Sequence, residues 1–280
     1  MSLTERNDLT TTSDGRPPPV PPRHLGTAGV LWRILGAVLT VAAIGWAAFN
    51  VVSIVAHEEH TETDRYSAAD LTGLSIVTDN GRVRVTATET DEIIVRTRVS
   101  EGLRDTDRSV GTSDGVLRLN GSCPAIGGEW CRVGYEVEVP RDLAVTIVSH
   151  NGSVDVTGVA AAVSVDADNG SILLQDVRGP VVATSDNGRV EGSALRAPDV
   201  RADSDNGRIE LSFAAAPTRV DARSDNGSVV VTVPDTGEAY VVTLDNDTGD
   251  QQLDVRVDPT SERQLLLSSD HGAVRALTAG

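Results

Sequence analysis

The chain has 280 residues and a formal net charge of −17, with 39% apolar and only 3% aromatic residues. No basic cluster is apparent outside the N-terminal flank, which argues against nucleic acid as a partner, because neutralising phosphates requires clustered cations. A core with few aromatic rings must be built from Val, Ile, Leu and Ala, which favours thin stacked strands over a thick globular interior.

Residues 1–24 are predicted to form a disordered cytoplasmic tail. The segment is rich in Thr, Ser, Pro and Asp, and its stretch "GRPPPVPPR" suits neither a helix interior nor a buried core. A proline-rich ligand for an SH3-type domain is the alternative, although a plain linker explains the same composition.

Residues 28–56 are predicted to form a single transmembrane helix. From Ile34 onward about 23 residues carry no charge, enough to cross a hydrocarbon layer of about 30 Å. Arg16, Arg23 and Arg33 precede this run, whereas acidic residues follow it, so the positive-inside rule places the N-terminus in the cytoplasm and the C-terminal part outside. A cleaved signal peptide is the rival interpretation, but the apolar run is too long for one.

Residues 57–69 are expected to be a juxtamembrane linker. They begin with "HEEH" at residues 57–60, where the two histidines are three positions apart. The helical zinc motif of metalloproteases needs histidines four apart, so a solvated acidic collar is favoured over a weak metal site.

Residues 70–280 are predicted to be an extracytoplasmic repeat domain. A small polar residue, Asp, Asn and Gly recur before an alternating apolar run, and the glycine-to-glycine interval grows from about 18 to about 23 when Gly249 is counted between Gly227 and Gly272. The candidate turn residues are Asp79, Asn80, Gly81, Asn151, Gly152, Asp168, Asn169, Gly170, Asp186, Asn187, Gly188, Asp205, Asn206, Gly207, Asp225, Asn226, Gly227, Asp270 and Gly272.

Each repeat predicts two short strands joined at a fixed corner, because apolar residues alternate on both sides of the glycine. Within one repeat this pattern also fits a hairpin, in which Val165 would face Leu174. Recurrence of the same residue types between repeats instead favours stacked parallel strands, with residue 190 paired to 209 and 209 to 229. The fold class is therefore all-β, a right-handed parallel β-solenoid; an antiparallel β-sandwich or meander is the alternative.

The corner glycines are expected to adopt backbone angles that a Cβ would strain. Gly207→Val should then cost about 1 to 3 kcal/mol, and Arg208→Ala under about 0.5. The aspartates would stack along one corner and repel one another, so hydrogen bonds to turn amides, the neighbouring Arg189 and Arg208, or a bound calcium ion must offset the repulsion.

The two cysteines, Cys123 and Cys131, are separated by "PAIGGEW" and lie outside the membrane in the expected topology, where oxidation is permitted. A local disulfide is predicted, because the spacing fits neither a metal site nor a redox pair.

The repeated phrase behind an N-terminal anchor resembles the bacterial "putative adhesin" domains of unknown function, which are similar to head-GIN adhesin-like β-solenoids. The resemblance covers roughly residues 70–280 and implies a right-handed β-helix outside the bacterial cytoplasmic membrane. It carries over no catalytic residue. Residues 102–140 depart from the repeat pattern.

No catalytic motif is present, and the ectodomain beyond residue 70 has only His150 and His271 as imidazoles, both in the corner column. We therefore predict a non-enzymatic surface or envelope module, adhesin-like or a scaffold, with no cofactor, no metal, no nucleic acid and an unidentified envelope protein or polysaccharide ligand. A polysaccharide hydrolase or lyase is the alternative. Its cleft would need aromatic walls, for which the candidates are Tyr66, Trp130, Tyr135, Phe213 and Tyr240. A membrane sensor is a weaker third possibility.

Overall fold

A computed structural model describes residues 27–55, 58–101, 106–124 and 131–279. The expected apolar helix is present as α1, Thr27–Val55. Its segment Gly29–Phe49 has a mean hydropathy of 1.8 and no residue buried against protein, so its length and composition suffice to cross a membrane. The predicted tail, residues 1–24, and the predicted helix end at residue 56 lie outside the described residues.

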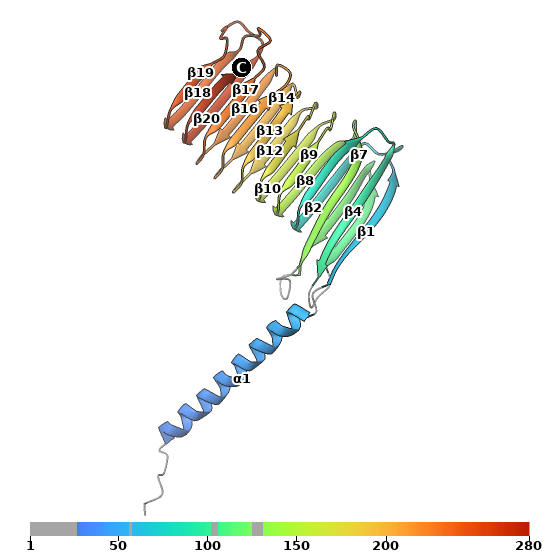
Figure 1. The fold of residues 1–280 in the computed structure, drawn as a ribbon, viewed down its shortest axis with the longest axis vertical. Coiled ribbons are helices and arrows are strands. Elements are labelled where there is room, and N and C mark those ends of the chain that lie inside the picture. Colours follow the sequence, from blue (N-terminus) through green and yellow to red (C-terminus); the bar gives the residue numbers. More distant parts are fainter. Residues whose placement is uncertain (1–26, 56–57, 102–105, 125–130, 280) are drawn as a thin grey trace, which may run out of the picture. The chain divides into compact units, whose positions relative to one another are not determined.

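The rest of the described chain is built of strands (Figure 1). In chain order they are β1 Glu58–Ser67, β2 Gly73–Asn80, β3 Val83–Thr88, β4 Glu92–Glu101, β5 Asp107–Ser113, β6 Val116–Ser122, β7 Arg132–Pro140, β8 Ala144–Asn151, β9 Val154–Thr157, β10 Val163–Asn169, β11 Ile172–Gln175, β12 Val181–Ser185, β13 Val190–Leu195, β14 Asp199–Ser204, β15 Ile209–Phe213, β16 Arg219–Ser224, β17 Val229–Val233, β18 Val241–Thr248, β19 Gln251–Asp254, β20 Gln264–His271 and β21 Val274–Thr278.

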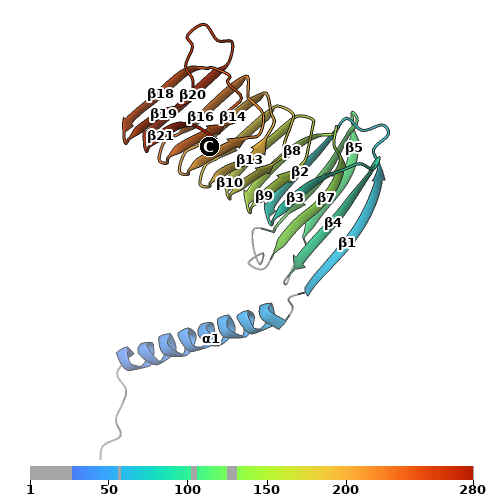
Figure 2. The ribbon, with the colours of Figure 1, turned by 45° about the horizontal axis from the view of Figure 1, so that its top comes forward.

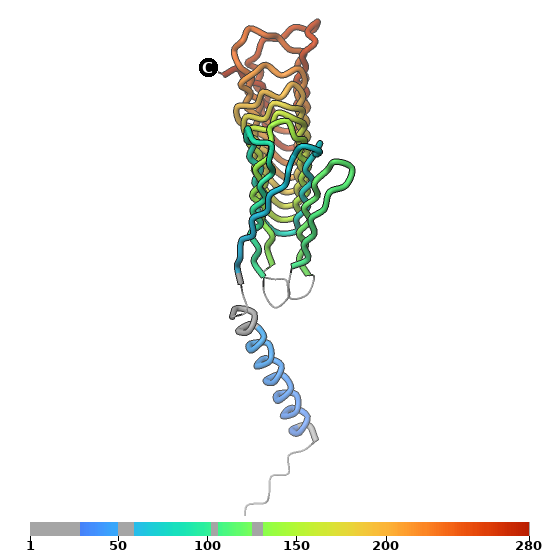
Figure 3. The backbone as a smooth tube through the Cα atoms, turned by 90° about the vertical axis from the view of Figure 1, so that its right-hand side faces the viewer, coloured from blue at the N-terminus to red at the C-terminus, as the bar shows by residue number. Residues whose placement is uncertain are grey.

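The strands form two sheets, one of 11 strands and one of 10, and from β6 onward the chain alternates between them. We call one strand of the 10-stranded sheet, the corner that follows it and the next strand in the 11-stranded sheet a rung; β14 and β15 make one rung. Neighbouring rungs pair in parallel, and Val190, Ile209 and Val229 are joined in register, as the repeats predicted. Figure 3 shows the successive turns of the chain lying one on another. The hairpin alternative is wrong for the repeats, because β10 pairs with β8 and β12 rather than with β11.

The alternating apolar columns form the core between the two sheets. Val200 and Ala202 of β14, and Ile209 and Leu211 of β15, are almost fully buried, and the equivalent residues of the other inner rungs are buried in the same way. In the last rung, β18–β19, Val242 and Leu244 are only partly buried and Leu253 is exposed. Because side chains alternate across a strand, the residues between them face solvent. Small and medium aliphatic side chains fill the narrow space, as the low aromatic content predicted.

The order of the rungs differs from the sequence order at both ends. The rung β20–β21 pairs directly with β16–β17, and β18–β19 lies beyond it as the last rung. Gly249 therefore does not stand between Gly227 and Gly272, as the simple glycine frame assumed. At the other end, β6 and β7 lie outside β2 and β3, on which β8 and β9 stack from the other side.

The prediction that residues 57–69 form a linker is wrong, because residues 58–67 form strand β1, which pairs antiparallel with β4. β4 pairs antiparallel with β7, and β5 with β6, so these strands cap the N-terminal end of the stack (Figure 2). The residues of β1 pair with residues that lie between 25 (Ser67 with Glu92) and 43 (Glu58 with Glu101) positions further along the chain, so the local sequence carries no signal for this strand beyond alternation. Residue 57 lies outside the described residues.

Three corner glycines, Gly81, Gly152 and Gly249, have the left-handed φ that was expected, but the others are required for a different reason. Gly207 does not have a left-handed φ, and neither do Gly170, Gly188, Gly227 and Gly272. Instead, a Cβ at each would collide with the backbone of the neighbouring rung. At Gly207 it would lie 1.8 Å from the carbonyl oxygen of Gly188. Close approach between rungs, rather than backbone strain, thus excludes a side chain.

We expect Gly207→Val to destabilise the fold by about 3 kcal/mol, the upper end of the penalty for overpacking, because the obstructing atom is backbone and cannot rotate away. Chemical denaturation of the full chain in detergent measures the loss. Arg208→Ala is the matched control. It removes only an exposed pair with Glu210 at 3.8 Å and should cost under about 0.5 kcal/mol. Equal losses in the two variants would contradict the close-approach argument.

Candidate functional site

The corner asparagines form a side-chain ladder along the stack. The amide nitrogen of Asn206 donates to the amide oxygen of Asn187 at 3.0 Å, and Asn226 donates to Asn206 at 3.1 Å. Asn187 donates to Asn169, and Asn169 to Asn151, both at 3.2 Å. Each inner asparagine thus donates to one neighbour and accepts from the other, which fixes the register of successive corners.

A second ladder stands beside the first. The hydroxyl of Ser224 donates to the carbonyl oxygen of Gly207 at 2.8 Å, and Ser269 donates to Gly227 at 2.7 Å. Ser204 and Ser185 make the same contact with Gly188 and Gly170 at slightly greater distances. The small polar residue that begins the repeated phrase could have predicted this ladder.

The corner aspartates differ from their expected role. Asp186 and Asp205 are exposed, and neither forms an ion pair with any described residue, because Arg189 pairs with Glu191 and Arg208 with Glu210. Their main chain contributes instead, since the carbonyl oxygen of Asp186 accepts the amide hydrogen of Asn206 at 2.8 Å. Within the described ranges no three His, Cys, Asp or Glu side chains gather as metal ligands would.

The first and last corners have their own arrangements. Asp79 accepts the backbone N–H of Cys123 at 2.8 Å and lies 3.3 Å from Nδ1 of His150. The structure joins Cys123 to Cys131 by a disulfide. Asn80 pairs with Asn151 in register, whereas Asp270 and Gly272 belong to the corner of the β20–β21 rung. These residues hold the corner column together, and they do not converge on a cavity.

The residues needed by the hydrolase alternative do not form a cleft. Tyr135, Phe213 and Tyr240 are almost fully buried in the core, Tyr66 is partly buried, and Trp130 lies outside the described residues. Burial raises the pKa of Tyr135 to about 12. Phe213 and Tyr240 line none of the described surface hollows, and Tyr135, which borders one, is only 3% exposed and offers no ring face on which a sugar could stack.

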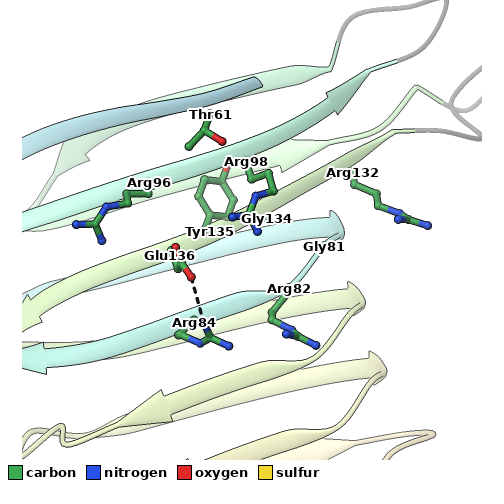
Figure 4. A pocket seen from close by; sticks show the side chains of 10 residues that line it. All are labelled: Thr61, Gly81, Arg82, Arg84, Arg96, Arg98, Arg132, Gly134, Tyr135 and Glu136. Carbon is green, nitrogen blue, oxygen red and sulfur yellow. Dashed lines mark hydrogen bonds and ion pairs between the residues drawn. The ribbon is translucent and has the colours of Figure 1, made fainter. Parts of the chain in front are cut away.

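The most notable surface feature is an arginine-lined hollow on the outer face of the 11-stranded sheet near the capped end (Figure 4). It has a volume of about 120 Å³. Its lining residues are Thr61, Gly81, Arg82, Arg84, Arg96, Arg98, Arg132, Gly134, Tyr135 and Glu136. We call this feature the arginine hollow. The prediction that the chain has no basic cluster beyond its N-terminal flank is therefore wrong, because these arginines come from separate strands that only strand pairing brings together.

Strand register explains why the hollow forms. Across the strands, Thr61 of β1 is level with Arg98 of β4, which is level with Gly134 of β7. Arg82, just before β3, lies on the other side of Gly134, since a Cβ there would approach the Arg82 carbonyl oxygen to 3.1 Å. Gly134 has no side chain to fill the outer surface between the two arginines, so a depression remains.

The outward-facing residues one step further along these strands include carboxylates as well as arginines. Glu136 lies level with Arg96 and Arg84 and accepts a hydrogen bond from Arg84 at 3.1 Å. Arg84 also pairs with Asp155 at 3.3 Å, and Arg96 with Glu138 at 2.7 Å. These pairs organise the lower rim of the arginine hollow.

An ion pair closes the cap on the opposite face of these strands. Arg108 of β5 donates to Glu62 of β1 at 2.6 Å and so connects the two sheets. This hydrogen bond holds the pKa of the Glu62 carboxyl below its ordinary value. The pair is partly exposed, which limits what it contributes to stability.

The comparisons with known proteins give structural likeness at low identity. The chain is similar to a "putative adhesin" from Bacteroides fragilis, with 15% identity and a TM-score of 0.45 over 78% of this chain and 97% of that chain. It is also similar to a "putative cell adhesion protein" from Clostridium sporogenes, with 9% identity and a TM-score of 0.38 over 79% of this chain and 100% of that chain. These names agree with the resemblance noted in the sequence. No family model and no curated protein matches the chain.

Asn206→Asp tests the asparagine ladder. An ionised carboxylate cannot donate to Asn187, so the variant should lose about 1 kcal/mol of unfolding free energy at neutral pH. The protonated carboxyl can donate, so the pKa of the new group is raised in the folded state and the deficit should shrink as pH falls through it. Denaturant unfolding at several pH values measures this. The control is Asp205→Asn, which removes an unpaired charge and should not destabilise the fold. Equal unfolding free energies for the two variants would refute the asparagine ladder.

The Glu62–Arg108 pair predicts a pH dependence of the cap. Because the folded pKa of Glu62 is depressed, its stabilisation is present above the ordinary value of 4.5 and is lost as pH falls through the folded value. As the pH is lowered from 5, the melting temperature of the wild type should therefore fall more than the melting temperature of the Glu62→Gln variant. A parallel decline in both proteins would show that the pair does not stabilise the cap.

Proposed function

We propose that the chain is a non-enzymatic, membrane-anchored module of the bacterial cell envelope, adhesin-like or a scaffold, that binds through the faces of a right-handed β-solenoid. The observation that carries this proposal is the charge arrangement on the sheet faces. Arg84, Arg96, Arg189, Arg201 and Arg208 each pair with a carboxylate along open strands. Such rows present a wide polar surface for recognition, whereas catalysis requires acid and base groups that converge.

The right-handed winding is proposed on topological grounds. Strands β10 and β12 are parallel neighbours in one sheet, and β11 connects them through the other sheet. Connections of this type between parallel strands are right-handed in the great majority of folds, because of the inherent twist of the strands. The repeated rungs then form a solenoid with two extended faces.

The anchor and its orientation complete the proposal. Helix α1 is apolar and exposed along its described length, which suits a lipid environment. The bias of Arg16, Arg23 and Arg33 to its N-terminal side supports a cytoplasmic N-terminus and an extracytoplasmic repeat domain. Residues 70–280 would then face the outside of the cytoplasmic membrane, in an environment compatible with the Cys123–Cys131 disulfide.

The alternative, a polysaccharide hydrolase or lyase, finds less support. A glycosidase needs one carboxylic acid with a raised pKa to protonate the leaving group. Among the described carboxyl groups, those with a displaced pKa, which are Glu62, Glu101, Asp176 and Asp258, all have it lowered by hydrogen bonds. These groups favour the ionised form at neutral pH and are poor proton donors.

Cells that express the full chain provide the test. Protease added to intact spheroplasts should remove the repeat domain, and such cells should adhere to surfaces coated with envelope polysaccharide more than cells without the chain. Purified full chain incubated with the same polysaccharide should release no reducing ends or unsaturated products. A protected repeat domain, absent adherence or steady product release would each overturn the proposal.

A further inference from the structure

The arginine hollow is an exception on an acidic protein. Five arginines and one glutamate line it, although the chain as a whole carries a formal charge of −17. The mutual repulsion of like charges and their competition for carboxylates make such a group costly unless something compensates it. The described carboxylates compensate only part of it.

Three of the five arginines have guanidinium N–H groups that no described carboxylate accepts at close range. Arg98 reaches only Glu59, at 4.0 Å, with both side chains mostly exposed. Arg82 donates from Nε to the neutral hydroxyl of Ser153 at 2.9 Å and pairs with no described carboxylate. Arg132 has neither a hydrogen bond nor an ion pair with the described part of the chain through its side chain. By contrast, Arg84 and Arg96 are engaged by Glu136, Asp155 and Glu138.

These three arginines, Arg82, Arg98 and Arg132, surround the depression at Gly134. Arg98 lies level with it on β4, Arg82 flanks it beside β3, and Arg132 precedes it by two residues on the same face of β7. Figure 4 shows the Arg98 side chain beside Gly134 and the Arg132 side chain extending outward at the edge of the arginine hollow. Guanidinium groups offer planar pairs of N–H donors that match the oxygens of a carboxylate or a phosphate. Three such groups around one small hollow form a receptor for an oxyanion.

The surface also leaves room for a chain attached to that oxyanion. A second open depression, lined by Thr86, Thr88, Val137 and Glu138 together with Arg84, Arg96 and Glu136, shares these last three residues with the arginine hollow. Its volume is about 260 Å³. The hydroxyl group of Thr86 suits hydrogen bonding to a polyol or sugar, whereas that of Thr88 already contacts Val139 and Thr90. The carboxylate of Glu138 at the rim disfavours a second anionic group there.

We propose that the arginine hollow binds an oxyanion group, carboxylate or phosphate, of an acidic glycan whose neutral portion lies along the adjoining depression. This proposal deepens the proposed function by naming the ligand chemistry, and it rests on that function for its envelope setting. Binding by the purified chain and adherence of cells are separate measurements. Loss of the first with retention of the second would therefore reject the arginine hollow and leave the surface role standing.

The test uses the full chain in nanodiscs of neutral phosphatidylcholine, titrated calorimetrically with three polymers. Polygalacturonate supplies carboxylates, poly(glycerol phosphate) supplies phosphates, and dextran is neutral. At least one acidic polymer should bind, more weakly at high salt, and the tighter of the two identifies the oxyanion. Dextran should not bind. Failure of both acidic polymers, or equal binding of dextran, would overturn the proposal.

Substitutions separate the arginine hollow from general charge. Combining Arg82→Gln, Arg98→Gln and Arg132→Gln should raise the Kd of the tighter polymer at least tenfold. The matched control combines Arg118→Gln, Arg256→Gln and Arg275→Gln, which lie outside the arginine hollow and the adjoining depression and give an identical change in net charge, and it should alter Kd less than twofold. Similar effects from the two triple variants, or none from the first, would contradict a specific site.

Gly134→Val tests the shape of the arginine hollow without changing its charge. Gly134 has no left-handed φ, and the new side chain would occupy the depression between Arg98 and Arg82. With far-UV circular dichroism matching wild type, Kd should rise at least fivefold. Unchanged affinity in this folded variant would show that the ligand does not enter the arginine hollow.

Discussion

Everything in the repeat domain depends on the close approach of corner backbones between neighbouring rungs. At the corner of each rung from Gly81 to Gly249, an added Cβ would lie 2.3 Å or less from a carbonyl oxygen of the adjacent rung. Only glycine permits this approach, which brings the flanking serine and asparagine side chains within hydrogen-bonding distance of the next corner. Parallel register, the two ladders and the narrow aliphatic core all follow from it.

Much of this architecture could be predicted from local sequence. The apolar columns, such as Val200 with Ala202, repeat at a regular interval, and stacked rungs place equivalent residues side by side. Helix α1 was equally evident, because about 23 uncharged residues in succession need no tertiary context to be recognised. The chemistry of the corner was predicted less well, since Asn-Gly has the same signature whether it makes a hairpin turn or a tightly packed corner.

The remaining features arise from long-range pairing and left no local signal. Strand β1 is acidic and becomes a strand by pairing with β4, and the final rungs exchange order because a long connection allows β20 to reach β16. The arginine hollow was missed for the same reason. Arg82, Arg98 and Arg132 are distant in sequence, and only the register of β3, β4 and β7 brings them around Gly134. The oxyanion site that we propose is a consequence of that register.

Cysteine cross-linking of outward-facing positions measures the parallel stack most directly. Val182 and Arg201 are partners in neighbouring rungs, so Val182→Cys with Arg201→Cys should form a disulfide readily under mild oxidation. In a hairpin across the corner, Arg201 would instead face Ser212, which here belongs to the other sheet. The stack therefore predicts cross-linking of the 182/201 pair and none of the Arg201→Cys, Ser212→Cys pair. The reverse result would contradict it.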